Sequence, residues 1–226
     1  MDRSSERLFD ISSPIVDSVG YTLADASFYK PKEFQASWKR RGDRIELKIS
    51  DYLIDAPDEV IGSFVRTVIR TVSKKDPRYE KEYLDWVTSD SFINEKRKIY
   101  LRRSRNLTLS SEGNERDLIT SLDRLLDDGI LEPNDIDNSF FSWTNMPNIR
   151  KVGFCSPMMR VVGISSILDD VNVPEFVLDY VVYHESLHLA QGYRPGVRAH
   201  DTTFRKKERA FPRYEEAERY LRSLKK

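Results

Sequence analysis

The sequence is short of several kinds of residue, and each shortage excludes a class of protein. Its 226 residues contain one cysteine, Cys155, which excludes an internal disulfide and a thiolate metal cage and predicts an uncrosslinked, cytoplasmic protein. No apolar run approaches the ~20 residues of a membrane span, so no membrane partner is expected. Excess charge is absent as well, because 37 Lys and Arg balance 37 Asp and Glu. Balanced charge argues against nucleic-acid binding through an overall positive field.

Histidine is also scarce, and its placement is the most informative feature of the chain. All three histidines lie within 17 residues, at His184, His188 and His200. The first two form a His-Glu-x-x-His string, and the preceding apolar residues are spaced like the buried face of a helix. Pro174 suits a first helical turn and Gly192 suits a C-cap. We therefore expect a helix over about 174–191.

In such a helix the string has the spacing of a metal site. Residues four apart share a face, so His184 and His188 would lie side by side as two ligands of one ion. Glu185 would be rotated about 100° from His184, beside the ion, where a general base belongs. Two imidazoles, a third protein ligand and an open fourth position favour one Zn²⁺ per chain. The alternative is a pair of ordinary histidines with a helix-favouring glutamate between them.

The third ligand has more than one candidate. A loop with Pro and Gly follows Gly192, and a second helix is expected from His200 to Glu208, so the loop can turn His200 back toward the pair. Zinc also accepts carboxylate oxygen, and the glutamates that could replace His200 are Glu208, Glu215 and Glu216. The metzincin pattern is excluded, because its third histidine position holds Arg194.

Five features follow one another from about residue 143 to residue 204. They are Trp143, a hairpin strand at 150–155, a strand at 160–168, the helix from Pro174 to His188, and His200-x-x-x-Phe204. In this order they resemble the SprT-like zinc metallopeptidases, including the YgjP-like group of minigluzincin-type proteins. The resemblance covers roughly the last 40% of the chain. It departs from the family where Ser186 replaces the usual Leu and where the loop 189–199 is longer than in the shortest members.

The resemblance implies a zincin-like peptidase domain at 140–226, with a small antiparallel sheet beside the active-site helix. It implies hydrolysis of protein or peptide substrates, with Glu185 taking a proton from water and passing it to the leaving amine. The strand 160–167 would hold the substrate by strand addition. Candidates for oxyanion or substrate contacts are Tyr193, Arg198 and Tyr214, although for each tyrosine a packed aromatic with its hydroxyl at the surface is the commoner role.

Residues 1–139 are expected to form a mainly helical region. A strand at 44–50 precedes a helix from about residue 56, and further helices are predicted at 78–87, 91–104 and 114–127, with a linker at 131–139. The pattern over about 44–90 parallels the strand and helix of the metal motif, which predicts a degenerate copy. That copy would bind no metal, because it carries Thr67, Val68 and Thr71 in place of the two histidines and the glutamate. Apolar spacing alone could also produce the match.

The densest basic run lies at 95–105 and includes Arg102, Arg103 and Arg105. Some SprT-like relatives act on proteins attached to DNA, so a basic helix would suit phosphate contact. A solvated helix face is the alternative explanation. The sequence as a whole predicts an α+β zinc peptidase, and the competing hypothesis is a metal-stabilised binding module, DNA-associated, with vestigial or latent proteolysis.

Overall fold

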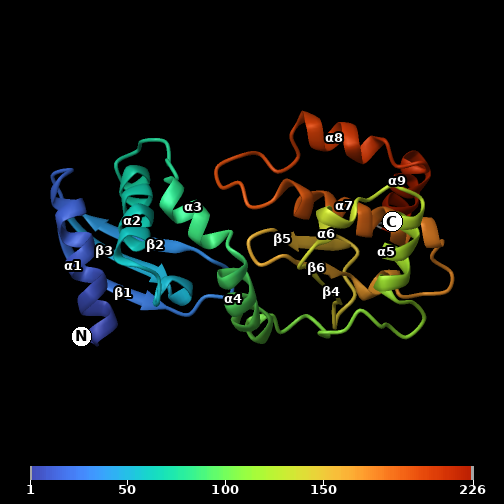
Figure 1. Cartoon of the computed structure of the whole chain (residues 1–226), viewed down its shortest axis with the longest axis horizontal. Coiled ribbons are helices and arrows are strands. Elements are labelled where there is room, and N and C mark those ends of the chain that lie inside the picture. The colour runs from blue at the N-terminus through green and yellow to red at the C-terminus, as the bar shows by residue number, and fades with distance from the viewer. Residues whose placement is uncertain (1, 225–226) are drawn as a thin grey trace. The chain divides into compact units, whose positions relative to one another are not determined.

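The computed structural model describes residues 2–224 and has the expected α+β composition. The chain forms two compact units, Met1–Arg103 and Ser104–Lys226 (Figure 1). This division differs from the predicted boundary at 139/140, because helix α5 (Leu118–Asp127) packs against helix α7 (Glu175–Gln191) in the second unit. Among the described residues, no helix is both long and apolar enough to cross a membrane.

The first unit is a mixed three-stranded sheet with helices. Its elements are α1 (Arg3–Asp17), β1 (Thr22–Tyr29), β2 (Ala36–Arg41), β3 (Arg44–Ser50), the 3-10 turn η1 (Asp51–Leu53), α2 (Asp58–Val72), α3 (Lys81–Val87) and α4 (Asp90–Arg103). Strand β3 is central, parallel to β1 and antiparallel to β2. The strand predicted at 44–50 and the helix that follows it are confirmed. The expectation of a mainly helical region missed β1 and β2.

The second unit repeats this plan with more helices. Its elements are α5, α6 (Pro133–Ile136), β4 (Phe140–Trp143), β5 (Gly153–Ser156), β6 (Val161–Ile164), η2 (Ser166–Leu168), α7, α8 (Thr202–Arg209) and α9 (Tyr214–Ser223). Strand β6 is central, parallel to β4 and antiparallel to β5, so the sheet is mixed and not antiparallel as expected. The predicted linker at 131–139 lies inside this unit and contains α6.

Helix α7 runs through the core of the second unit. Ten of its residues are buried, on all sides of the helix, so packing rather than one apolar stripe holds it. Pro174 precedes its first turn, and Gly192 ends it with a φ of 68°, a value that favours glycine. Asp179 on α7 accepts hydrogen bonds from Arg124 of α5 at 3.0 and 2.7 Å, which fixes α7 against its neighbour. The predicted span of 174–191 is confirmed to within one residue.

The two units share one topology. Each runs helix, strand, edge strand, central strand, 3-10 turn and helix, with the same strand order and the same orientations; the second unit adds α6. At the end of the central strand of the first unit, Ser50 N donates to Gln35 O at 3.0 Å, and at the corresponding place in the second unit Ser165 N donates to Val152 O at 2.8 Å. The likeness therefore covers about 3–72, so it begins earlier and ends earlier than the range of about 44–90 that the sequence predicted.

Candidate metal centre

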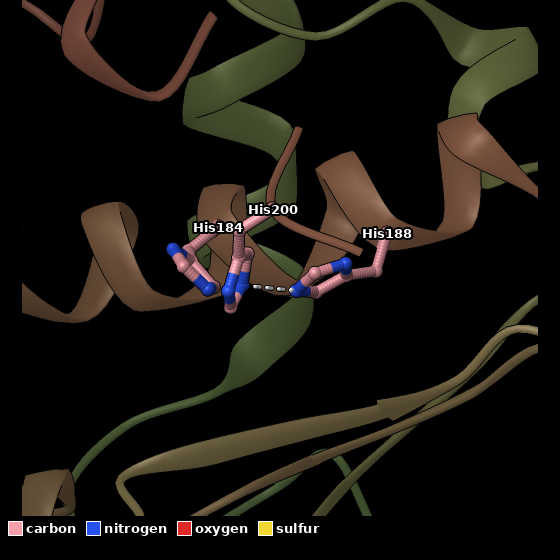
Figure 2. A group of neighbouring side chains, drawn as sticks. All are labelled: His184, His188 and His200. Carbon is pink, nitrogen blue, oxygen red and sulfur yellow. Dashed lines mark hydrogen bonds between the residues drawn. The ribbon is translucent and has the colours of Figure 1, made fainter. Parts of the chain in front are cut away.

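The three histidines converge at one place in the second unit (Figure 2). One ring nitrogen from each of the three lies within 4.8 Å of the other two, and the Nε2 atoms of His188 and His200 are 3.0 Å apart. Two imidazole nitrogens bound tetrahedrally to one zinc ion would be about 3.3 Å apart. The side chains are half-buried, so an ion could reach them from solvent. The predicted group of His184, His188 and His200 could therefore hold one metal ion.

Local structure accounts for this convergence. His184 and His188 are four residues apart on α7, and their ring centroids are 5.3 Å apart. His200 precedes α8, where the Asp201 side chain caps the helix by accepting from Phe204 N at 2.8 Å. The Phe204 ring is buried with its centroid 4.5 to 5.1 Å from those of all three histidines. The Asp201 cap and the packing of the Phe204 ring against the histidines account for the four-residue spacing between His200 and Phe204.

Glu208, one of the alternative ligands, lies behind the site. Its Oε1 is 2.8 Å from His184 Nδ1, and it is 5% exposed. When Nδ1 carries the proton, the Nδ1–H group donates a hydrogen bond to the Glu208 carboxylate. The Nε2 lone pair of His184 is then free to bind a metal. Glu215 and Glu216 are also outside the ligand group, and Glu216 pairs with Arg213 at the surface. Glu208 therefore supports His184 from behind and is not a member of the ligand group.

The rings of His184 and His188 have the electronic state that a metal ligand needs. Burial is the first cause that lowers the pKa of His184 to about 4, and the neighbouring His200 lowers it further. Burial likewise lowers the pKa of His188 to about 4, with added repulsion from the other two rings. Both imidazoles are therefore neutral at pH 7, with lone pairs available for coordination. Three imidazoles form a donor set that suits zinc and other first-row transition metals.

Glu185 lies against the edge strand β5. A Cβ atom added to Gly153 of that strand would lie 2.6 Å from Glu185 Oε1, so the carboxylate passes directly over the glycine. A cavity of about 240 Å³ is lined by both residues and by His184 and Tyr180. Burial raises the pKa of Glu185 to about 8, and the positive charge of Lys151 opposes that rise. Burial therefore brings the pKa of this carboxyl close to the range in which a general acid or base can act.

The structure contradicts the prediction that the strand at 160–167 holds a substrate by strand addition. Residues 160–167 include β6, which is hydrogen-bonded to β4 on one side and to β5 on the other. Neither edge of β6 is available to an added strand. Strand β5 lies at the end of the strand order β4-β6-β5 in the described part of the chain and contacts α7, so β5 is the edge strand beside Glu185. Sequence periodicity identified the strands but could not order them within the sheet.

The other predicted contact residues are distributed around the site. Arg198 lies on the loop between α7 and α8 and lines a cavity that His200 also lines. Tyr214 packs against Tyr180, with ring centroids 5.7 Å apart, and lines neither that cavity nor the one at Glu185. Tyr193 is half-buried in the loop and also lines neither cavity. Arg198 is thus placed beside a histidine of the predicted metal group, in the cavity that both residues line.

The basic run at 95–105 is partly neutralised within the first unit. Lys96 is 4% exposed and pairs with Asp55 at 2.6 Å, and Arg103 pairs with Asp51 at 2.6 Å. Arg103 also donates to the carbonyl of Pro31. These two cations stabilise the unit and are not available to phosphate groups, which removes part of the support for a nucleic-acid surface here.

Among residues 2–103, which the structure describes in the first unit, no equivalent group of metal-binding side chains is found. Thr67 and Thr71, at the places of His184 and His188, donate to backbone carbonyls of their own helix. Strand register places Phe34 where Lys151 lines the cavity beside Glu185. Phe34 packs edge-on against Phe64 of α2 at 5.1 Å. The first unit therefore has packed aromatic rings at the place where the second unit has the cavity beside Glu185.

Glu208 provides a first test of the ligand geometry. Replacing Glu208 with glutamine is expected to weaken metal binding about 10- to 100-fold, because an amide holds the Nδ1 proton of His184 less strongly than a carboxylate does. The dissociation constant can be measured by competition with a chromogenic chelator. Glu216→Gln is the matched control, since Glu216 is exposed and pairs with Arg213. Equal weakening in both variants would show that Glu208 has no special role.

Comparisons of this chain with protein-family models, with curated proteins and with solved structures found no match. Any function proposed for the chain therefore rests on its own residues and their geometry.

Proposed function

We propose that the second unit is a zinc-dependent peptidase of the zincin type, as the resemblance to SprT-like proteins implies. The observation that carries the proposal is the convergence of three histidines beside a buried glutamate that faces an edge strand. A site that only stabilised the fold would need no acid–base group, and its protein ligands would usually fill all four positions. This arrangement instead has three histidines with a carboxylate next to them.

The chain's own residues supply the remaining chemistry. A zinc ion held by the three histidines would polarise a peptide carbonyl and make water more acidic. Glu185 would accept a proton from water as the water oxygen bonds to the carbonyl carbon. The same carboxyl would return the proton to the amide nitrogen as the C–N bond breaks, giving a carboxylic acid and an amine. Glu208 would hold the His184 ring in one orientation throughout.

Strand β5 would bind the substrate in place of β6. An extended peptide can add to the free edge of β5 through backbone hydrogen bonds, which are independent of side-chain identity. Gly153 matters here, because the absence of a side chain lets Glu185 approach the strand to which the peptide would add. The scissile bond would then lie near both the carboxylate and the three imidazoles.

The first unit would be a metal-less copy of the second. The shared order of strands and helices supports duplication of one ancestral unit, with later loss of the ligands in the first copy. Its aromatic residues and buried ion pairs stabilise that unit without leaving a metal site. This arrangement assigns the chemistry to residues 104–226 alone.

Metal content tests the proposal directly. Elemental analysis of the purified full chain should find about one zinc per chain, and His188→Ala should lose most of it, because two imidazoles bind zinc far more weakly than three. Circular dichroism would check that the variant is folded, and Glu175→Gln at the exposed start of α7 is the control. A wild-type chain that takes up no zinc even after incubation with the ion would refute the proposal.

A further inference from the structure

A second cavity opens beside the metal centre, on the side of α8. It has a volume of about 710 Å³, and its charged lining comes from the loop before α8 and from α8 itself. We call this cavity the basic pocket, and the residues that define it are Arg198, His200, Asp201, Arg205, Lys206 and Arg209. His200 belongs both to this pocket and to the ligand group, so a molecule in the pocket lies next to the metal centre.

Most of the positive charge in the basic pocket is not neutralised by the protein. Asp201, the one acid in the lining, already caps α8 and accepts from Arg194 at 3.2 Å. Arg205 lies 3.5 Å from Glu208, which is committed to His184. Within residues 2–224, the side chains of Lys206 and Arg209 make no ion pair or hydrogen bond, and the same holds for Arg198. Three cations therefore face the cavity without a partner.

This charge is a local feature. The whole chain is neutral, but residues 193–213 contain seven Lys and Arg against two acids. The cavity that contains Glu185 has a mixed lining instead, in which Arg150, Lys151 and Arg222 lie with the acids Glu185 and Glu218. The unpaired positive charge is therefore concentrated in the basic pocket. Fixed cations in a concave site concentrate negatively charged ligands.

The shape of the basic pocket favours an acidic side chain over a nucleic acid. Helix α8 has 8 residues and spans about 12 Å. Duplex DNA carries a charge about every 1.7 Å and is bound through longer rows of cations. A single Asp or Glu side chain fits a concave pocket, and Arg and Lys bind carboxylates through charge-assisted hydrogen bonds. We propose that the basic pocket binds acidic side chains of the peptide substrate next to the bond that is cut. This inference rests on the peptidase function proposed above.

Matched peptides test the preference. Two peptides that differ only by Glu or Gln at the positions flanking the cut bond are expected to differ about tenfold in kcat/KM, with the acidic peptide cleaved faster. The double variant Lys206→Gln/Arg209→Gln should bring that ratio close to one. The control is Lys39→Gln/Arg41→Gln, which makes the same chemical changes at exposed positions on β2 of the first unit and should keep the tenfold ratio. A ratio near one in the wild-type protein would overturn the inference.

A binding measurement separates this inference from the proposed function. The Glu and Gln peptides are each labelled with a fluorophore and mixed at low salt with the Glu185→Gln protein. Fluorescence anisotropy should give a dissociation constant about tenfold lower for the Glu peptide than for the Gln peptide. The wild type could cleave no peptide while the binding selectivity is present and is lost in Lys206→Gln/Arg209→Gln. That result would refute the peptidase function and support the basic pocket as a binding site for acidic side chains. If the same double variant abolishes binding of a 30-base-pair DNA and changes neither peptide measurement, the pocket is a DNA contact and the inference fails.

Discussion

Replacing Glu185 with glutamine is expected to lower the rate of peptide hydrolysis about 10²- to 10⁴-fold while the protein keeps its zinc. Glutamine has nearly the same shape and still fits over Gly153, so the three histidines should remain in place. An amide cannot accept the proton of the attacking water or return it to the leaving amine. The measurement is kcat/KM on a cleaved peptide, together with zinc content on the same preparation.

The control for this variant is Glu175→Gln on the same helix. Glu175 lies in the first turn of α7, exposed and 3.3 Å from Arg116, so its loss should change kcat/KM less than twofold. Full activity in Glu185→Gln would contradict the assigned mechanism even if zinc is bound. Loss of zinc in that variant would instead show that the carboxyl contributes to metal binding.

Local signals in the sequence were sufficient for α7 and for the two candidate metal ligands it carries. Pro174 and Gly192 mark the ends of the helix through their own backbone preferences, and the four-residue spacing of two histidines is a property of any helix. The position of His200 was also predictable, because a short capped helix follows a turn. Each of these features depends on residues close together in the chain.

Features that depend on partners far along the chain were missed. Strand β1 has an irregular register between Leu23 and Asp25, which breaks the alternation that would reveal a strand. Strand β2 is exposed over nearly its whole length and therefore has little apolar pattern. The glutamate at 208 was weighed as a ligand because spacing alone cannot show that it faces the back of His184. Strand order, and with it the choice of β5 over β6, is likewise set by tertiary pairing.

Gly153 illustrates the limit for a single residue. A glycine inside a predicted strand signals a bulge or a close approach by another group, but it does not say which group approaches. In the structure the group is Glu185, 32 positions along the chain, and a Cβ at residue 153 would lie 2.6 Å from its Oε1 and 2.9 Å from its Cγ. Contacts this short cannot be accommodated without displacement of the carboxylate or of the strand.

Gly153→Ala is therefore expected to lower kcat/KM at least tenfold with zinc retained. The added methyl group must displace Glu185, and small displacements of a catalytic group cost large factors in rate. Overpacking should also lower the free energy of unfolding by about 1–3 kcal/mol. Ser156→Ala, at the other end of β5, controls for changes to the strand itself and should alter neither quantity strongly. Peptide kinetics and urea denaturation on the same preparations measure both.

A double-mutant cycle shows whether Glu185 is the cause. If the alanine methyl destabilises the protein by striking the carboxylate, Gly153→Ala should cost at least 1 kcal/mol less in a Glu185→Ala background than in the wild type, because shortening the side chain removes the clash. Urea denaturation of the four metal-free proteins gives this coupling energy without reference to catalysis. Additive costs would mean that residue 153 acts through the strand alone, and the placement of Glu185 over β5 would then be wrong.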